Sequence, residues 1–201
     1  MKAFELKKSI EELLDRHANG RYNVVSPQNR KSDAESIFTK PQVTVYYAEG
    51  SFDKSKSSVN SPYHHDTSFN IHLVTASKAT VDVDTLKNPN ATPAQYANAL
   101  AETNNASALL DAKIDSLLSV LFDILMRPEN RKLGTDYNTN RFIPKIKKYD
   151  IEKTGAIVIG GATITLTAQC EEEVSGEEAV QGDGVDTIVD LGDLSKQGVK
   201  P

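Results

Sequence analysis

The residues best suited to bind a metal lie together near the middle of the chain. His64, His65 and Asp66 are adjacent, and His72 follows further along. Histidine nitrogens and carboxylate oxygens are zinc ligands, but neighbouring residues of a strand point to opposite faces, so the two adjacent histidines do not easily share one ion. The chain has one cysteine, Cys170, and therefore cannot supply a cysteine ligand set. We interpret the group as a histidine pair in a loop beside the start of a strand, and we predict no metal site.

Nucleophilic and phosphate-binding chemistry find little support in the sequence. A serine hydrolase needs a positioned Ser, His and Asp, but there is no Gly-x-Ser-x-Gly elbow and no histidine after His72. The segment QGDGVD around Gly182 has the glycines of a phosphate loop, yet it lacks the Lys-Ser/Thr ending and lies among acidic residues that repel phosphate. We interpret it as a linker and predict no catalytic residue, no cofactor site and no enzymatic activity.

Basic residues are concentrated between residues 127 and 153. One interpretation is a positive rim that contacts DNA or an acidic neighbouring subunit, and the alternative, which we favour, is a solvated face of a strand and a loop. The candidates for such contacts are Arg141, Lys145, Lys147 and Lys148.

The C-terminal end of the chain is strongly acidic. The net charge is −5, and from Glu171 onward nine acidic residues stand against Lys196 and Lys200, which gives −7 there and +2 for the rest. Such an extension suits solubility or docking on a basic neighbour better than nucleic-acid binding. One hypothesis is that the tail of one subunit docks on the basic stretch of the next; an oligomer unchanged by tail deletion would contradict it.

Length and composition predict one α+β domain over residues 1–172 and an acidic, Gly-rich extension over residues 173–201. The N-terminus lacks the apolar block of a signal peptide, and no stretch approaches the roughly 18 apolar residues of a membrane span. We therefore expect a soluble cytosolic protein without membrane contact. Cys170 is expected to be a small apolar filler in a strand.

The first half of the chain predicts a helix followed by strands. The helix covers residues 3–17, with Phe4, Ile10, Leu13 and Leu14 on its apolar side. Strands are expected at RYNVV and QVTVYYAEG, separated by a polar loop, and the Ser- and Lys-rich residues 50–62 are expected to form a long hairpin loop. In the returning strand, residues 65–77, alternation places five residues on the core face: Thr67, Phe69, Ile71, Leu73 and Thr75.

The second half predicts a long amphipathic helix and a closing sheet. Thr92 caps the helix, residues 103–105 could interrupt it, and Pro128 ends it. Its apolar stripe is Leu110, Ile114, Leu117, Leu118, Leu121 and Leu125, opposite Asp111, Asp115, Ser119 and Asp123. An edge strand containing Pro144 is expected over residues 141–149, and Gly160-Gly161 predicts a tight turn. The fold class is therefore a mixed, largely antiparallel sheet flanked by both helices.

This order of elements resembles the tail-terminator proteins of long-tailed bacteriophages and related contractile injection machines. The resemblance covers most of residues 1–172 and rests on the N-terminal helix, the strand pair with its long loop, and the segments SFNIHLV, ASALLDAKIDSLLSVL and GAIVIGGATITLTAQCE. It implies a ring, commonly a hexamer, on the head-proximal end of the tail tube. The ring ends tube polymerisation and offers a surface to the neck proteins.

The resemblance also implies partners and a location. The partners are other copies of the chain, the tail tube protein, the neck or head-completion protein and the sheath protein, while genomic DNA passes through the ring without sequence-specific binding. The protein would be assembled in the host cytoplasm and reside in the virion. By position, the loop residues Ser51, Lys54, Lys56 and Ser57 would face the tube or the lumen, and the basic candidates Arg141, Lys145, Lys147 and Lys148 would contact neighbouring rings or DNA.

Two alternatives remain open. The first is a head-tail connector, neck or tail-completion protein of the same particle, which only its position in an assembled particle would separate from a terminator. The second is a small enzyme of nucleic-acid or cell-wall metabolism, which would need clustered carboxylates or histidines; the chain offers the stepped Asp111, Asp115 and Asp123, which are typical of a solvated helix face.

Overall fold

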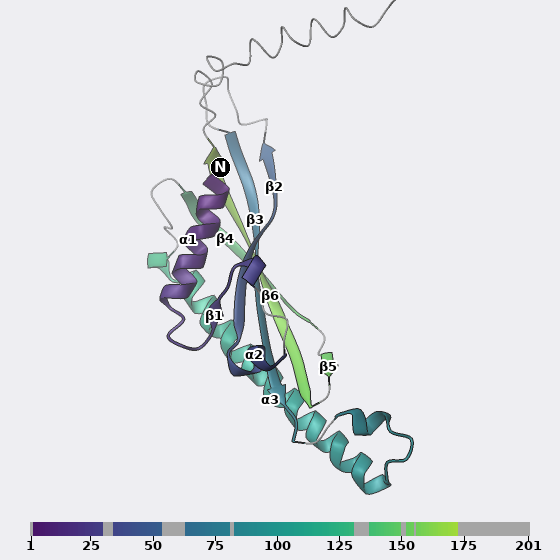
Figure 1. Cartoon of the computed structure of the whole chain (residues 1–201). Helices are drawn as coiled ribbons and strands as arrows, with labels where there is room; N and C mark the ends of the chain where they lie inside the picture. The colour runs from purple at the N-terminus through teal and green to yellow at the C-terminus, as the bar shows by residue number, and fades with distance from the viewer. Residues whose placement is uncertain are drawn as a thin grey trace, which may run out of the picture.

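The chain folds as an α+β domain in which a mixed sheet packs against two helices, as its sequence predicts (Figure 1). The computed structural model describes residues 2–29, 34–53, 63–80, 83–130, 137–149, 152–154 and 156–172. In chain order the elements are α1 (Lys2–Arg16), β1 (Asn23–Val24), η1 (Pro27–Asn29), α2 (Ala34–Thr39), β2 (Gln42–Asp53), β3 (Tyr63–Lys78), η3 (Val83–Lys87), α3 (Pro93–Met126), η4 (Pro128–Asn130), β4 (Tyr137–Lys148), β5 (Glu152–Thr154) and β6 (Ile157–Glu172).

The sheet has the strand order β1-β2-β3-β6-β4, and β5 also pairs with β6. The short pairing of β1 with β2 is parallel, and the other pairings are antiparallel. The predicted edge strand is confirmed and lengthened, because β4 borders the sheet and includes Pro144. Proline is tolerated in an edge strand because half of the strand's backbone N–H groups have no partner strand, so the N–H that proline lacks is not needed for a sheet hydrogen bond.

The predicted hairpin joins β2 and β3. Both strands are longer than expected: β2 continues to Asp53 and β3 begins at Tyr63. Residues 50–53, expected in the loop, therefore belong to a strand, because they pair with residues 64–67 of β3. The histidine pair expected in a loop also lies within β3. The rest of the predicted loop, residues 54–62, lies outside the described residues.

The core lies between one face of the sheet and the two helices α1 and α3. The alternation predicted for β3 is confirmed, since Phe69, Ile71 and Leu73 are fully buried there. The α3 stripe is confirmed too, with all six predicted residues buried. Phe4 is the exception on α1: 53% of it is exposed, and it lies edge-on to the ring of Tyr47 at the end of the helix.

The predicted interruption at residues 103–105 is wrong, because α3 is one continuous helix of 34 residues. Its start is as expected, and Thr92 and Gln95 add a reciprocal capping box. Thr103, a weak helix former, is fully buried and donates from its hydroxyl to the carbonyl of Ala99 over 2.7 Å. Because the buried hydroxyl has a hydrogen-bond partner, the packing of Thr103 outweighs its low helix propensity.

The predicted turn at Gly160-Gly161 is also wrong. The two glycines lie inside β6, which runs straight from Ile157 to Glu172 and pairs with β3 along its whole length. A Cβ at Gly161 would collide with the carbonyl oxygen of Leu73 on β3. Gly161 therefore marks a close approach of two backbones and not a reversal of the chain.

Two smaller elements also differ from expectation. The strand expected from Arg21 shrinks to β1, and the polar loop after it contains the one-and-a-half-turn helix α2. Ile37 of α2 is buried, and α2 contacts β3. One buried apolar residue does not produce the 3.6-residue apolar period by which a helix is recognised in a sequence.

Candidate functional site on the open face of the sheet

The face of the sheet opposite α1 and α3 is largely polar. Cross-strand pairing places its residues in rows that run from β2 through β3 and β6 to β4. One row is Tyr46, Asn70, Thr165 and Lys145, and the next is Thr44, His72, Thr163 and Lys147. We call this surface the open face. Thr44 and Thr163 of these rows are buried, whereas Lys145 and Lys147 are exposed and can form hydrogen bonds with another polar surface.

A groove of about 480 Å³ crosses the open face. It brings together two residues that the sequence assigned to separate candidate sites, Ser51 of β2 and Lys145 of β4. Between them, β3 and β6 contribute hydroxyl groups and one carboxylate. The polar residues that line it are Glu49, Ser51, Asp66, Thr67, Ser68, Lys145, Thr165 and Thr167. Among the described residues, the lining holds two carboxylates and one ammonium group, so it suits a partner that both donates and accepts hydrogen bonds.

The predicted basic residues divide between the two faces of β4. Lys145 and Lys147 are exposed on the open face, in line with Thr165 and Thr163. Lys148 lies on the other side, where its Nζ is 2.8 Å from Asp111 Oδ1 and 2.6 Å from Asp115 Oδ1. Its hydrogen bonds to these two carboxylates raise the pKa of Lys148.

The pairing of Lys148 changes how the basic stretch can act. Its charge is already balanced by α3, which leaves Lys145 and Lys147 as the better candidates for an external contact. Arg141 lies within β4, but its side chain is outside the described residues. The loop candidates Lys54, Lys56 and Ser57 are outside them as well.

Aromatic side chains form a cluster on the open face. The rings of Tyr46 and His72 lie 4.8 Å apart, and the ring of Tyr149 lies 6.1 Å from that of His72. The hydroxyl of Tyr149 forms a hydrogen bond with Thr163, so Tyr149 folds back over the sheet directly after β4. The cluster therefore links β2, β3 and the residue after β4 on this face.

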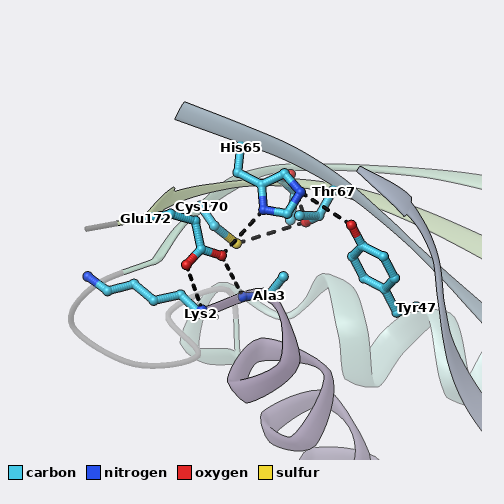
Figure 2. A network of polar contacts seen from close by, with 8 residues as sticks. Lys2, Ala3, Tyr47, His65, Thr67, Cys170 and Glu172 are labelled. Atoms are coloured by element: carbon cyan, nitrogen blue, oxygen red, sulfur yellow. Dashed lines mark hydrogen bonds and ion pairs between the residues drawn. The ribbon is translucent and has the colours of Figure 1, made fainter. Parts of the chain in front are cut away.

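A second polar group is buried on the helix side of the sheet, at the start of α1 (Figure 2). The carboxylate of Glu172, the last residue of β6, accepts hydrogen bonds from the backbone N–H groups of Lys2 at 2.9 Å and Ala3 at 3.1 Å. The first N–H groups of a helix have no partner within it, and their partial positive charge favours an anion. Glu172 therefore caps α1 from another element.

His65 connects this carboxylate to β2. It is fully buried, with Nδ1 at 3.3 Å from Glu172 Oε1 and Nε2 at 3.3 Å from the hydroxyl of Tyr47 (Figure 2). A Cβ on Gly50 would collide with His65 Nε2 and with the Tyr47 hydroxyl, so a larger residue there would displace this pair. Phe52 covers the other side with its ring stacked at 4.1 Å on the imidazole. We call the partly buried Tyr47 together with the buried His65 and Glu172 the buried triad.

The electrostatics of this region favour a fixed, structural arrangement. Burial by itself raises the pKa of Glu172, but the hydrogen bonds from Lys2, Ala3 and His65 outweigh it and leave the pKa below its ordinary value. Burial raises the pKa of the neighbouring Cys170 thiol, whose Sγ lies 3.9 Å from the Thr67 hydroxyl. A buried, protonated thiol is a poor nucleophile, which agrees with the predicted role of Cys170 as a strand filler.

The described part of the chain contains neither a cluster of metal ligands nor a membrane-spanning helix. Among its histidine, cysteine, aspartate and glutamate side chains, no group of three or more is arranged to hold a metal ion. No helix in that part combines the length and the apolar character that crossing a membrane requires.

Sequence reasoning did not find the buried triad. It placed His65 beside a strand start and Glu172 at a domain boundary, and it gave Tyr47 no role. One signal was available: His65 has the same parity as Thr67 and Phe69, so strand alternation puts it on the core face. Its partner Glu172 lies 107 residues away, and only the pairing of β3 with β6 brings them together.

Comparison with known proteins adds no family to this picture: neither the models of protein families nor the curated proteins include a match to this chain.

Proposed function

We propose that this protein is a structural component of a phage-type tail that assembles as a ring on the end of the tail tube, in the manner of tail-terminator proteins. The open face is the observation that carries the proposal. Both large helices lie on one face of the sheet, and the other carries a polar groove together with the exposed side chains of Lys145 and Lys147. A protein that must dock on copies of itself and on a tube needs such preformed surfaces.

The edges of the sheet support the same proposal. β4 borders the sheet along its length, and Lys145 and Lys147 project from it toward the open face. Lysines and a proline on an edge strand discourage open-ended strand pairing between copies. Contacts between subunits are then restricted to specific surfaces, and a heterologous contact of this kind closes into a ring when its rotation divides a full turn.

The proposal is tested by measuring mass in solution and by imaging. We expect sedimentation across a range of protein concentrations to show a closed oligomer, and negative-stain images with tail tubes to show added density at one tube end. Density at the head side of the neck, away from the tube end, would instead indicate a connector or completion protein. A chain that stays monomeric at every concentration and does not bind tail tubes would overturn the proposal, because a ring that is weak in solution should still form on the tube end.

A further inference from the structure

A separate groove of about 530 Å³ lies between the middle of α3 and the segment that follows α1. Its floor is apolar and its charged groups are cations. The apolar residues are Pro41, Leu117 and Val120, and the polar ones are Arg21, Lys113 and Ser116. We call this hollow the α3 groove.

The α3 groove continues into a smaller hollow of about 160 Å³ that shares Arg21 and Val120 with it. The smaller hollow adds Arg127 and His17, and it contains one carboxylate, Asp123. Together the two linings hold three permanent cations against one anion. A ligand that carries several carboxylates and some apolar groups would match both the charge and the floor.

Lys113 is the most informative residue of the α3 groove. It is half-buried, its Nζ donates to the carbonyl of Ala76 over 3.3 Å, and it lies 6.0 Å from the centre of the Phe38 ring. Both partners are uncharged. Burial lowers the pKa of Lys113, which is the response of an ammonium group that has lost water without gaining a counter-ion among the described residues. A carboxylate placed here would recover part of that lost solvation.

The chain itself contains a segment with the required chemistry. Residues 185–194 read VDTIVDLGDL, which combines five apolar residues with three aspartates and no basic residue. Val, Ile and Leu side chains would fill an apolar floor, while the aspartates would meet Arg21 and Lys113 at its rim. This segment lies outside the described residues.

The reach of the chain permits this contact within one molecule. Glu172, where β6 ends, is hydrogen-bonded to the first residues of α1, and Arg21 follows the other end of that helix. A helix of 15 residues is about 22 Å long. The twelve residues from 173 to 184 can extend over about 40 Å, so they span that distance with slack.

We propose that residues 185–194 dock into the α3 groove of the same chain, with Asp186 and Asp190 paired to Arg21 and Lys113. The acidic extension is then an internal ligand that covers the groove. The proposal does not depend on ring assembly, because the groove and the segment belong to one molecule.

Hydrogen exchange on the full chain tests the docking. In the unaltered protein at low concentration, amides of residues 185–194 should exchange at least about tenfold more slowly than exposed amides. The double variant Arg21→Glu with Lys113→Glu should abolish this protection. Adding Asp186→Lys and Asp190→Lys to it should restore the protection, because the pairs are re-formed with opposite signs.

Matched controls separate docking from general charge effects and from loss of the fold. Lys147→Glu reverses one positive charge on the open face, as each substitution of the double variant does in the groove, and should leave the protection intact. The variant Asp186→Lys with Asp190→Lys leaves the described domain unaltered, so it removes the protection without any risk to folding. Exchange of residues 185–194 at the rate of exposed amides in the unaltered chain would overturn the proposal, and so would protection that appears only as concentration rises.

Discussion

At the scale of single residues, Glu172 joins three elements through one carboxylate. Glu172 is the last residue of β6. Its carboxylate caps α1 by accepting hydrogen bonds from the backbone N–H groups of Lys2 and Ala3, and it also contacts Nδ1 of His65 on β3. A charged acceptor in a buried site is worth about 1.5–3 kcal/mol per hydrogen bond when its partners are fixed. Glu172 therefore holds the start of α1 against the end of the sheet, directly before the acidic extension begins.

Replacing Glu172 by Gln should destabilise the protein by about 1–3 kcal/mol at neutral pH, because the amide cannot accept from all three donors as an anion does. The folded pKa of Glu172 is below its ordinary 4.5, so its contribution is fully present above 4.5 and is lost as pH falls through the folded pKa. The difference in free energy of unfolding between the two proteins should therefore shrink below pH 4.5. Chemical denaturation across pH measures it.

The exposed Glu49→Gln is the matched control for this substitution, since it makes the same chemical change on β2 without a capping role. It should change stability by less than about 0.5 kcal/mol. An equal loss for both variants, or a loss for Glu172→Gln that does not depend on pH, would show that the helix cap is not the source of the effect.

At the scale of elements, the pairing of β3 with β6 organises the molecule. These two strands pair over 16 residues each and carry the core side chains that meet α1 and α3. The same pairing aligns the rows of the open face and sets His65 beside Glu172. Damage to this pairing should therefore weaken the core and both polar sites together.

Gly161→Ala tests how closely β6 approaches β3. A Cβ there would collide with the Leu73 carbonyl oxygen, which is backbone and cannot rotate away. We expect a loss of about 1–3 kcal/mol in the free energy of unfolding, measured by thermal or chemical denaturation. Thr167→Ala, at an exposed position of the same strand, is the control and should cost much less. Equal stability of Gly161→Ala and the unaltered chain would show that the strands can separate there without penalty.

At the scale of the whole molecule, the helices divide the surface into one covered and one open side. The groove on the open face is lined by Lys145 of β4 and, across β6, by the carboxylates Glu49 of β2 and Asp66 of β3. The α3 groove lies on the other side, along the helix layer. The proposed assembly contact and the proposed docking of the extension therefore use different surfaces, and variants can separate them.

Lys145→Glu should weaken assembly while leaving the fold intact. The substitution gives the open-face groove a third carboxylate and removes its cation, so the protein concentration needed for half-maximal assembly should rise about tenfold or more. Sedimentation measures the assembly, and thermal denaturation should show little change. Lys78→Glu makes the same charge change at an exposed position near the end of β3 and should leave assembly unaffected. Equal behaviour of the two variants would remove the open-face groove from the proposed interface.

The sequence by itself determined the elements whose signals are local. Three local patterns predicted the α+β class: the apolar stripe of α3, the alternation of β3 and the helix cap formed by Thr92. Pro144 indicated an edge strand, because the residue itself excludes a central position. These predictions succeeded because short-range geometry fixes which residues share a face.

Tertiary structure alone decided the features that depend on a partner far along the chain. Gly161 looks like a turn residue until the carbonyl of Leu73 is placed against it, and Thr103 looks like a helix break until its burial is known. Ser51 of β2 and Lys145 of β4 line the same groove because the groove crosses β3 and β6, which lie between these two strands in the sheet. The physical reason is that a residue's conformation and pKa depend on what packs against it, and packing is set by strand order and register, which local patterns do not encode.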